Sequence, residues 1–403
     1  MTAVRNRLND ERTVVIAIAL LALLARVAII ASSHGGDDLR MYTYFSRVAL
    51  HGGNPFAPPH GGLYPAVDSN NPPVEVAVFT GLLAIHDSPT TLRMLFALAD
   101  VGTILLLGLA FARPWRWRLA FALFYAFNPF LLFAFTTFGE DKTLLFAGIC
   151  LWMLALERRN EWGAWIAATA LTVFKFLGAF AIPAMALDTY RRRRWWVLAP
   201  LAMFVVAFAL SNLPWISHSL DAFTRRNQRL GLNPPLHASP MLVLARLHLY
   251  ATIEPKLLTA AAILGVLALF AARKIEIREA VAFSLFAGYI FLPDDAFNRL
   301  LLIALPLMLL LDYTLARWIA IWVITSVAAL GAVVATRGVP SRLHGLGDPL
   351  RSVFAHEGTA RHALWMLLPT ALVLALYLYD RRAGRAPIPA AESAAPKALA
   401  AAS

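Results

Sequence analysis

Hydrophobic residues form long stretches along this chain, and polar residues gather in short clusters between them. A stretch of about 20 apolar residues is long enough to cross a membrane as a helix. The first stretch is longer than the apolar part of a signal peptide and has no small-residue cleavage pattern after it, so we expect a retained helix. The pattern predicts ten spanning segments, at residues 13–32, 90–112, 117–135, 142–156, 194–212, 256–272, 278–293, 297–312, 315–336 and 362–379.

Residues 162–187 form a further apolar stretch with Lys175 in its centre and Gly178 and Pro183 just after it. One spanning helix here would place the arginines of 191–194 on the translocated side, against the positive-inside rule. Two short half-helices that fold back at Lys175 return these arginines to the cytoplasm. We therefore predict an all-α membrane bundle of about twelve segments, two of them short.

Basic residues beside the helix ends set the orientation of this bundle, because cytoplasmic loops are enriched in Lys and Arg. With both termini in the cytoplasm, the short basic clusters fall on the cytoplasmic side, at Arg5/Arg7/Arg12, Arg113/Arg116/Arg118, Arg191 to Arg194, Arg273/Lys274/Arg278 and Arg381/Arg382. The same topology places three large loops outside, at residues 33–89, 213–255 and 337–361.

We expect a single transmembrane domain over residues 1–380 and a disordered, Ala- and Pro-rich cytoplasmic tail over 381–403. In the first outer loop, residues 39–50 are amphipathic at helical spacing, and residues 74–85 are apolar but short for a membrane span. Both are expected to be helices that lie along the membrane surface.

Composition supports the membrane class and excludes several others. Hydrophobic residues make up 59% of the 403 positions and charged residues 15%, against roughly 45–50% and 25% in soluble domains. The net charge of +12 does not indicate nucleic-acid binding, because the basic residues are divided among short clusters. The single cysteine, Cys150, lies in an apolar stretch and excludes a disulfide framework. The chain has no metal-ligand motif, Gly-rich phosphate loop or nucleophile elbow.

Two adjacent carboxylates, Asp37 and Asp38, follow the first apolar stretch directly. Like charges side by side at the mouth of a membrane helix are costly, which favours a functional explanation. An ionised carboxylate at the outer surface can accept a proton from a sugar hydroxyl. The pair is equally explained as the water boundary of the first helix.

A second polar group, Glu140-Asp141-Lys142, stands at the entrance of the segment that begins near residue 142. Two acids at a helix start are favourable on electrostatic grounds alone, so a solvated helix end remains the alternative to a substrate site. Lys175 is a stronger candidate, because an ammonium inside an intramembrane hairpin is costly unless it faces a polar cavity or an anion.

Further candidates lie in the later outer loops. Asp294, Asp295 and Arg299 come together before the segment at 297–312, and Arg299 can hold a phosphate by forked hydrogen bonds or extend to the membrane interface. Arg225 and Arg226 run against the positive-inside trend, which indicates an anionic ligand or anionic lipid headgroups. We interpret His344 and His356 as ordinary loop histidines, with a catalytic role as the less favoured alternative.

Three stretches resemble the GT-C class of integral-membrane glycosyltransferases, in particular the polyprenol-phosphate-mannose-dependent mannosyltransferases of glycosyltransferase family 87 and the related glycolipid mannosyltransferases. They are residues 38–42 with 53–56 and 71–73, residues 138–142 with Lys175, and residues 299–306. Phe56 and Asn71 stand where the family pattern usually has Tyr, and this difference leaves the sugar open.

The resemblance implies an inverting reaction that uses a lipid-linked sugar donor, with one first-loop carboxylate as general base. By motif position the base is Asp38, and Asp37 is the second choice. The donor phosphate would be bound by Lys142, Lys175, Arg299, Arg225 and Arg226. Residues that would line the site or bind the acceptor are Tyr42, Glu140, Asp141, Asp294, Asp295 and His344. No cofactor is required, although a divalent cation is compatible with the site, because Lys or Arg can offset the charge of the leaving phosphate.

The leading hypothesis is therefore a multi-pass glycosyltransferase of a bacterial plasma membrane. It would move a sugar from a polyprenyl-phosphate carrier to a glycolipid or glycan acceptor on the outer face. Mannose is the favoured sugar, and arabinofuranose and glucose are the alternatives. The alternatives are a transporter or flippase of lipid-linked sugars and a non-catalytic membrane scaffold. The absence of an evident internal repeat weakens the transporter hypothesis.

Overall fold

The computed structural model describes residues 2–56, 72–213, 236–237, 255–290, 294–295, 304–311, 314–337 and 360–383. Within these ranges the chain is helical apart from connecting turns and two short parallel strands, β1 (Leu236–His237) and β2 (Asp294–Asp295). The all-α prediction is therefore confirmed. The labelled helices are α1 (Thr2–Ser32), α2 (Asp37–Leu50), α3 (Pro73–Ile85), α4 (Pro89–Leu105), η1 (Leu106–Ala110), α5 (Trp115–Phe127), α6 (Pro129–Leu131), η2 (Leu132–Thr137), α7 (Lys142–Glu157), α8 (Glu161–Lys175), η3 (Leu177–Ala181), α9 (Ile182–Arg193), η4 (Arg194–Val197), α12 (Pro255–Ala271), α13 (Ile277–Ile290), α15 (Leu315–Arg337) and α17 (Ala360–Arg382). Residues 198–213 and 304–308 are helical as well.

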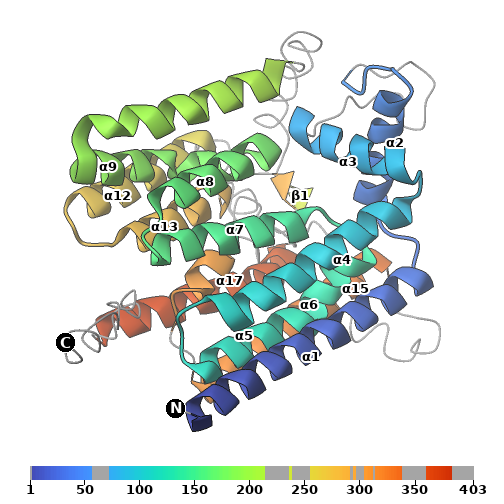
Figure 1. Ribbon diagram of the computed structural model, residues 1–403, viewed down its shortest axis with the longest axis horizontal. Helices are drawn as coiled ribbons and strands as arrows, with labels where there is room; N and C mark the ends of the chain where they lie inside the picture. The colour runs from blue at the N-terminus through green and yellow to red at the C-terminus, as the bar shows by residue number, and fades with distance from the viewer. Residues whose placement is uncertain are drawn as a thin grey trace.

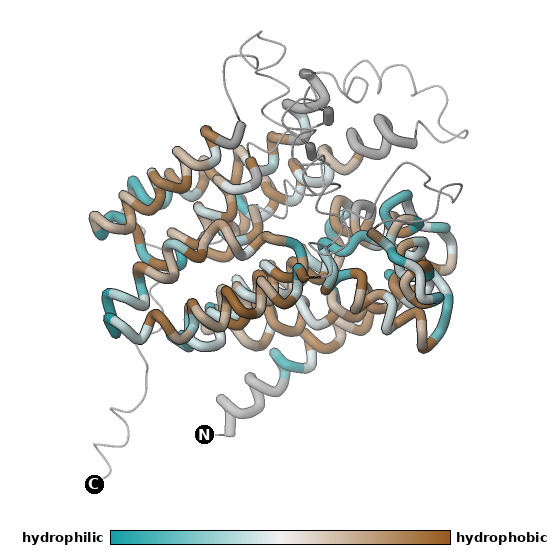
Figure 2. The backbone as a smooth tube through the Cα atoms, turned by 90° about the horizontal axis from the view of Figure 1, so that it is seen from above, coloured by the Kyte–Doolittle hydropathy of each residue, from teal (hydrophilic) through white to brown (hydrophobic). Residues whose placement is uncertain are grey.

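The protein is a membrane helix bundle. Among the described residues, three helical stretches are long and apolar enough to cross a membrane, namely Asp10–Ser32, Pro89–Ala110 and Leu177–Leu213. Helices α1, α4, α5 and α7 run side by side, and α2 and α3 pack together at one end (Figure 1). Figure 2 shows hydrophobic residues along the middle of the bundle and hydrophilic residues at its two ends, the pattern that a bilayer requires.

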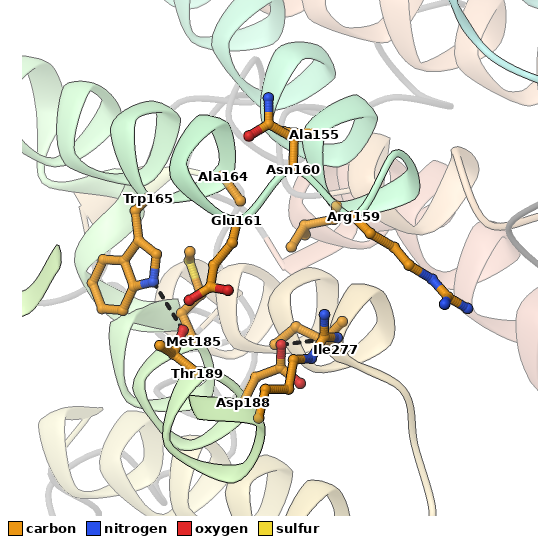
Figure 3. A pocket seen from close by; sticks show the side chains of 12 residues that line it. Ala155, Arg159, Asn160, Glu161, Ala164, Trp165, Met185, Asp188, Thr189 and Ile277 are labelled. Carbon is orange, nitrogen blue, oxygen red and sulfur yellow. Dashed lines mark hydrogen bonds and ion pairs between the residues drawn. The ribbon is translucent and has the colours of Figure 1, made fainter. Parts of the chain in front are cut away.

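The predicted hairpin at residues 162–187 is confirmed. Helix α8 ends at Lys175, and Phe176 takes a left-handed backbone conformation with φ of 59°. The chain then returns through η3 and α9, so that Trp165 Nε1 donates a hydrogen bond of 3.0 Å to Thr189 Oγ1 (Figure 3). Gly178 is required at the turn, because a Cβ there would collide with the carbonyl oxygen of Ala168.

The predicted segment at 117–135 is divided in the structure. Helix α5 ends at Phe127, and the side chain of Asn128 accepts a hydrogen bond of 3.0 Å from the backbone N–H of Phe130. Pro129 has no N–H with which to continue α5, so the chain starts the short helix α6 instead. The amide of Asn128 also donates to Thr325 Oγ1 on α15, at 2.8 Å, which anchors the break.

A buried polar network joins α1, α4 and α5. Arg26 is fully buried, and its Nε donates to Asp100 Oδ2 at 2.6 Å. The hydroxyl of Tyr125 donates to the other oxygen of Asp100 at 2.7 Å, and Arg26 also donates to the backbone oxygens of Tyr125 and Ala126. The charges are therefore compensated within the bundle, as a dry interior requires.

Parts of the predicted organisation lie outside the described residues. These are residues 57–71 of the first outer loop, almost all of the loops 213–255 and 337–361, and the tail beyond residue 383. Residues 381 and 382, predicted to begin the tail, belong to α17. Of the segment at 297–312, the structure describes residues 304–311, in which 304–308 are helical.

Candidate functional site

Two loops from distant parts of the sequence are fastened together at the end of the bundle that carries α2. The backbone N–H of Gly36 donates to the carbonyl oxygen of Phe138 at 2.7 Å. Arg93 on α4 bridges the same loops, donating to the backbone oxygens of Ser33 at 2.5 Å and of Thr136 at 3.1 Å. A side chain at Gly36 would collide with the ring of Phe138. These contacts bring the start of α2 next to the start of α7.

At this junction Lys142 contacts three carboxylates. Its Nζ lies 3.3 Å from Asp38 Oδ2 and 3.0 Å from Asp141 Oδ1, and it also contacts Glu140. Asp38 is in the first turn of α2, whereas the other two acids directly precede α7. The ammonium therefore links the first outer loop to the helix that follows the second acidic group.

Lys175 completes the cluster from the end of α8. Its Nζ lies 2.9 Å from Asp141 Oδ2 and 2.8 Å from Glu75 Oε2 on α3. The hydroxyl of Tyr42 donates to Asp141 Oδ1 at 2.8 Å, and the Lys175 ammonium lies 5.5 Å from the centre of the Tyr42 ring. Asp141 thus holds both ammonium groups at once.

The four acids of this cluster differ in the exposed fraction of their side chains. The side chains of Glu75 and Asp141 are fully buried and that of Glu140 is 8% exposed, whereas the side chain of Asp38 is 36% exposed. Asp38 is therefore the carboxylate of the cluster that solvent or a second substrate reaches most easily.

The acids of the cluster also differ in pKa, because burial and the lysine charges act on each to a different extent. Burial raises the pKa of Asp38, but the Lys142 ammonium and a hydrogen bond with Glu140 outweigh it and leave the pKa below its usual value. Burial dominates at Glu140 and raises its pKa to about 8. At Asp141 the two lysines outweigh burial, so its pKa lies well below the usual range. At neutral pH Asp38 is therefore ionised.

The structure brings most of the first-loop and hairpin candidates together. Asp38, Tyr42, Glu140, Asp141, Lys142 and Lys175 all belong to the cluster. Asp37 does not, because its side chain is 86% exposed and pairs with Arg40 at 3.4 Å. Glu75 was missed by the sequence analysis, and the available signal was that it is the only acid in the apolar stretch 73–85.

The structure describes only two of the later candidates. Asp294 and Asp295 form strand β2, which pairs with β1. Arg225, Arg226, Arg299, His344 and His356 lie outside the described residues. Within the described part of the chain, no group of three or more His, Cys, Asp or Glu side chains is arranged to hold a metal ion.

An apolar groove of about 680 Å³ lies near the cluster, and its lining residues Leu144 and Phe174 pack in the same hydrophobic group as Tyr42. Its walls come mainly from α7 and α8, with contributions from α3 and α4. Val74 and Phe174 line the groove and are sequence neighbours of Glu75 and Lys175, and the lining residue Leu144 lies two positions after Lys142. At the other end the lining includes Arg158 and Asn160.

A second pocket, of about 20 Å³, lies where α8 begins and α9 ends (Figure 3). Three of its charged residues already pair with one another or with a neighbour, because Arg192 lies 3.0 Å from Asp188 and Glu161 lies 3.3 Å from Arg193. The pocket has room for about one water molecule. The larger groove and the neighbouring charged cluster are therefore taken together as the candidate site.

Comparisons with known proteins give a limited result. No family model matches the chain, and no curated protein matches it. Among solved structures, the chain is similar to the crystal structure of ArnT from Cupriavidus metallidurans bound to undecaprenyl phosphate. The TM-score is 0.43 and the identity 17%, over 92% of this chain and 78% of ArnT. This overlap is loose, and the chemistry of the site is therefore interpreted from its own residues.

Proposed function

We propose that this protein is an inverting glycosyltransferase of the GT-C class that takes its sugar from a polyprenyl-phosphate carrier. The observation that carries the proposal is the pairing of Asp38 with Lys142 at 3.3 Å, near an apolar groove. A base, a pair of cations and a lipid-sized groove are the three features that such a donor and its reaction require.

The groups suit a single in-line displacement. The acceptor hydroxyl loses its proton to Asp38 as its oxygen attacks the anomeric carbon of the donor sugar. The bond between this carbon and the phosphate oxygen breaks on the opposite face, and the electron pair leaves with the polyprenyl phosphate. In this proposal Lys142 and Lys175 stabilise the negative charge that develops on the phosphate. Holding the acceptor hydroxyl, the anomeric carbon and the leaving phosphate in line supplies much of the rate acceleration.

Binding of the donor requires Lys142 and Lys175 to exchange carboxylate partners for phosphate oxygens. Asp141 contacts both lysines and is fully buried, so it keeps the two ammonium groups near each other during this exchange. Tyr42 holds the same carboxylate from the side of α2. We assign the base to Asp38 alone, because Asp37 points away from the cluster into solvent.

The finer assignments follow from the sequence resemblance. We propose mannose as the sugar, a glycolipid or glycan as the acceptor, and the outer face of a bacterial plasma membrane as the place of reaction, with both termini in the cytoplasm. In Figure 1, α1 begins and α17 ends on the side of the bundle opposite α2 and α3, which is the arrangement that this topology needs.

Incubation of the purified protein with labelled polyprenyl-phosphate-mannose and a membrane lipid extract tests the proposed function. The proposal predicts a labelled glycolipid or glycan product, formed with inversion at the anomeric carbon. We expect product formation to persist in the presence of a chelator, because two lysines are available to offset the phosphate charge. Movement of the intact donor across vesicles without transfer would instead identify a flippase. A complete lack of both activities would contradict an enzyme and a transporter alike.

A further inference from the structure

A sharp corner joins α9 to the helix of residues 198–213, at the end of the bundle opposite α2 and α3 (Figure 1). Residues 190–196 form this corner, and all of them are exposed. Trp195 and Trp196 are 74% and 66% exposed, and the ring of Tyr190 meets that of Trp195 edge-on, with 6.5 Å between the centres. Large aromatic rings with so little cover from the protein indicate an interaction surface.

The helix that follows places the corner at the membrane interface. It is the last part of the stretch Leu177–Leu213, which is long and apolar enough to cross a membrane. Leu198, Val205 and Leu210 on this helix are each more than half exposed. A helix with such an apolar surface lies in hydrocarbon, so the two tryptophans just before it lie where the bilayer meets water.

The arginines of the corner differ in their partners. Arg192 and Arg193 are compensated by acids, at 3.0 Å from Asp188 and 3.3 Å from Glu161. Arg194 stands next to the tryptophans, and no carboxylate of the described part of the chain pairs with it. Its charge is therefore available to a ligand at the membrane surface.

Arg191 connects the corner to the end of α12. It donates to the carbonyl oxygens of Phe270 at 3.0 Å and of Ala271 at 2.6 Å. Arg273 and Lys274 follow in the turn between α12 and α13, where both are exposed and neither pairs with a described carboxylate. The contact of Arg191 thus brings a second uncompensated pair of cations to the same part of the surface.

The backbone gives a further reason to examine two of these arginines. Arg194 has φ of 49° and Arg273 has φ of 55°, values that a glycine adopts without strain and other residues rarely do. Either turn would accommodate a glycine at lower cost. The two arginine side chains are therefore better explained by a ligand than by the turns that carry them.

We propose that this corner binds the headgroup of an anionic phospholipid. Arg194, Arg273 and Lys274 supply positive charge for the lipid phosphate, and Trp195 and Trp196 lie against the headgroup region. A lipid with net negative charge fits this surface, whereas a zwitterionic lipid also brings a cation that these groups repel. The site is separate from the charged cluster at Lys142, and the inference does not depend on sugar transfer.

Lipid retention by the purified full-length protein tests the inference. The protein in detergent is titrated with phosphatidylglycerol or with phosphatidylcholine of the same acyl chains, and native mass spectrometry counts the lipids that it retains. We expect retention of phosphatidylglycerol at concentrations at least tenfold lower than those needed for phosphatidylcholine. A cation near an anionic lipid surface strengthens binding roughly fivefold, so loss of two should remove most of this preference.

Arg194→Gly combined with Arg273→Gly removes two cations without a conformational cost. The substitutions relieve the backbone of both turns, so the melting temperature without lipid should stay the same or rise. Retention of phosphatidylglycerol should need at least tenfold more lipid. Arg40→Gln combined with Arg47→Gln is the matched control, because it removes two exposed charges from α2. It should leave the preference for phosphatidylglycerol unchanged.

Three results would overturn the inference. The first is equal retention of the two lipids by the wild type. The second is an equal loss of preference in both double variants, which would assign it to net charge alone. The third is displacement of phosphatidylglycerol by a large excess of inorganic phosphate from the wild type but not from the Arg194→Gly, Arg273→Gly variant, which would identify a site for a soluble anion.

Discussion

Asp38 and Lys142 form an ion pair of 3.3 Å, although 104 residues separate them in the chain. The pair joins the start of α2 to the start of α7, and it brings a solvent-accessible carboxylate near an apolar groove. The same lysine contacts Asp141, which in turn holds Lys175. The proposed base and the proposed phosphate-binding cations are thus parts of one connected cluster.

Asp141 should contribute to both stability and donor binding. Asp141→Asn removes the charge that compensates two ammonium groups, so we expect a loss of about 3 to 5 kcal/mol in the free energy of unfolding and a higher KM for the donor. Thermal unfolding in detergent and initial rates would measure these changes. Glu161→Gln breaks the half-exposed pair with Arg193 and should cost less than about 1 kcal/mol. Equal losses in the two variants would contradict this account of Asp141.

The buried pair of Arg26 and Asp100 should be structural. Arg26→Met leaves the Asp100 carboxylate uncompensated inside the bundle and should destabilise the fold by about 3 to 5 kcal/mol. The double variant Arg26→Met, Asp100→Asn should recover most of this loss, because the amide is neutral and still accepts the hydrogen bond from Tyr125. Equilibrium unfolding of the single and double variants measures the recovery. A double variant as unstable as the single one would show that the charges are not coupled.

Gly36 should position Asp38. Gly36→Ala introduces a Cβ that collides with Phe138 and shifts the first turn of α2, and a displacement of about 1 Å at a reacting group can cost about 100-fold in rate. We expect kcat to fall between 10- and 100-fold, with partial recovery when Phe138→Leu is added. Gly81→Ala on α3 is the control, because it meets nothing within 4 Å. A normal kcat in Gly36→Ala would contradict this role.

Glu140 should make stability depend on pH. Its pKa is about 8 in the folded protein, against a usual value of 4.5, so the folded state binds more protons than the unfolded state between these two pH values. The contribution of Glu140 to stability is therefore complete below about pH 4.5 and is lost as the pH rises through 8. The melting temperature of the wild type should fall over this interval more than that of Glu140→Gln. Parallel curves for the two proteins would contradict the raised pKa.

Much of the fold could be predicted from the sequence, because membrane insertion depends on the length of apolar stretches and on the placement of basic residues. The hairpin at Lys175 is the clearest example, since the arginines at 191–194 required the chain to turn back. The break at Asn128 was missed although Pro129 is visible in the sequence, because the apolar stretch continues through it.

The candidate site was predicted in part. Lys142 and Lys175 stood out because an ammonium beside or within an apolar stretch needs a partner, but the sequence did not show which acid would supply it. Glu75, Arg93 and the pair of Arg26 and Asp100 were missed for the same reason. Each is a charge within a largely apolar stretch of helix, and its partner is decided by helix packing.

The rate of sugar transfer by Asp38→Asn tests the central claim most directly, with Asp37→Asn measured beside it. Both variants remove one carboxylate from the same turn of α2, and their melting temperatures in detergent show that each is folded. The account predicts that Asp38→Asn loses transfer from polyprenyl-phosphate-mannose by about 100-fold or more, while Asp37→Asn keeps most of the wild-type rate. Full activity in folded Asp38→Asn, or a loss confined to Asp37→Asn, would contradict the assignment of Asp38 as the base.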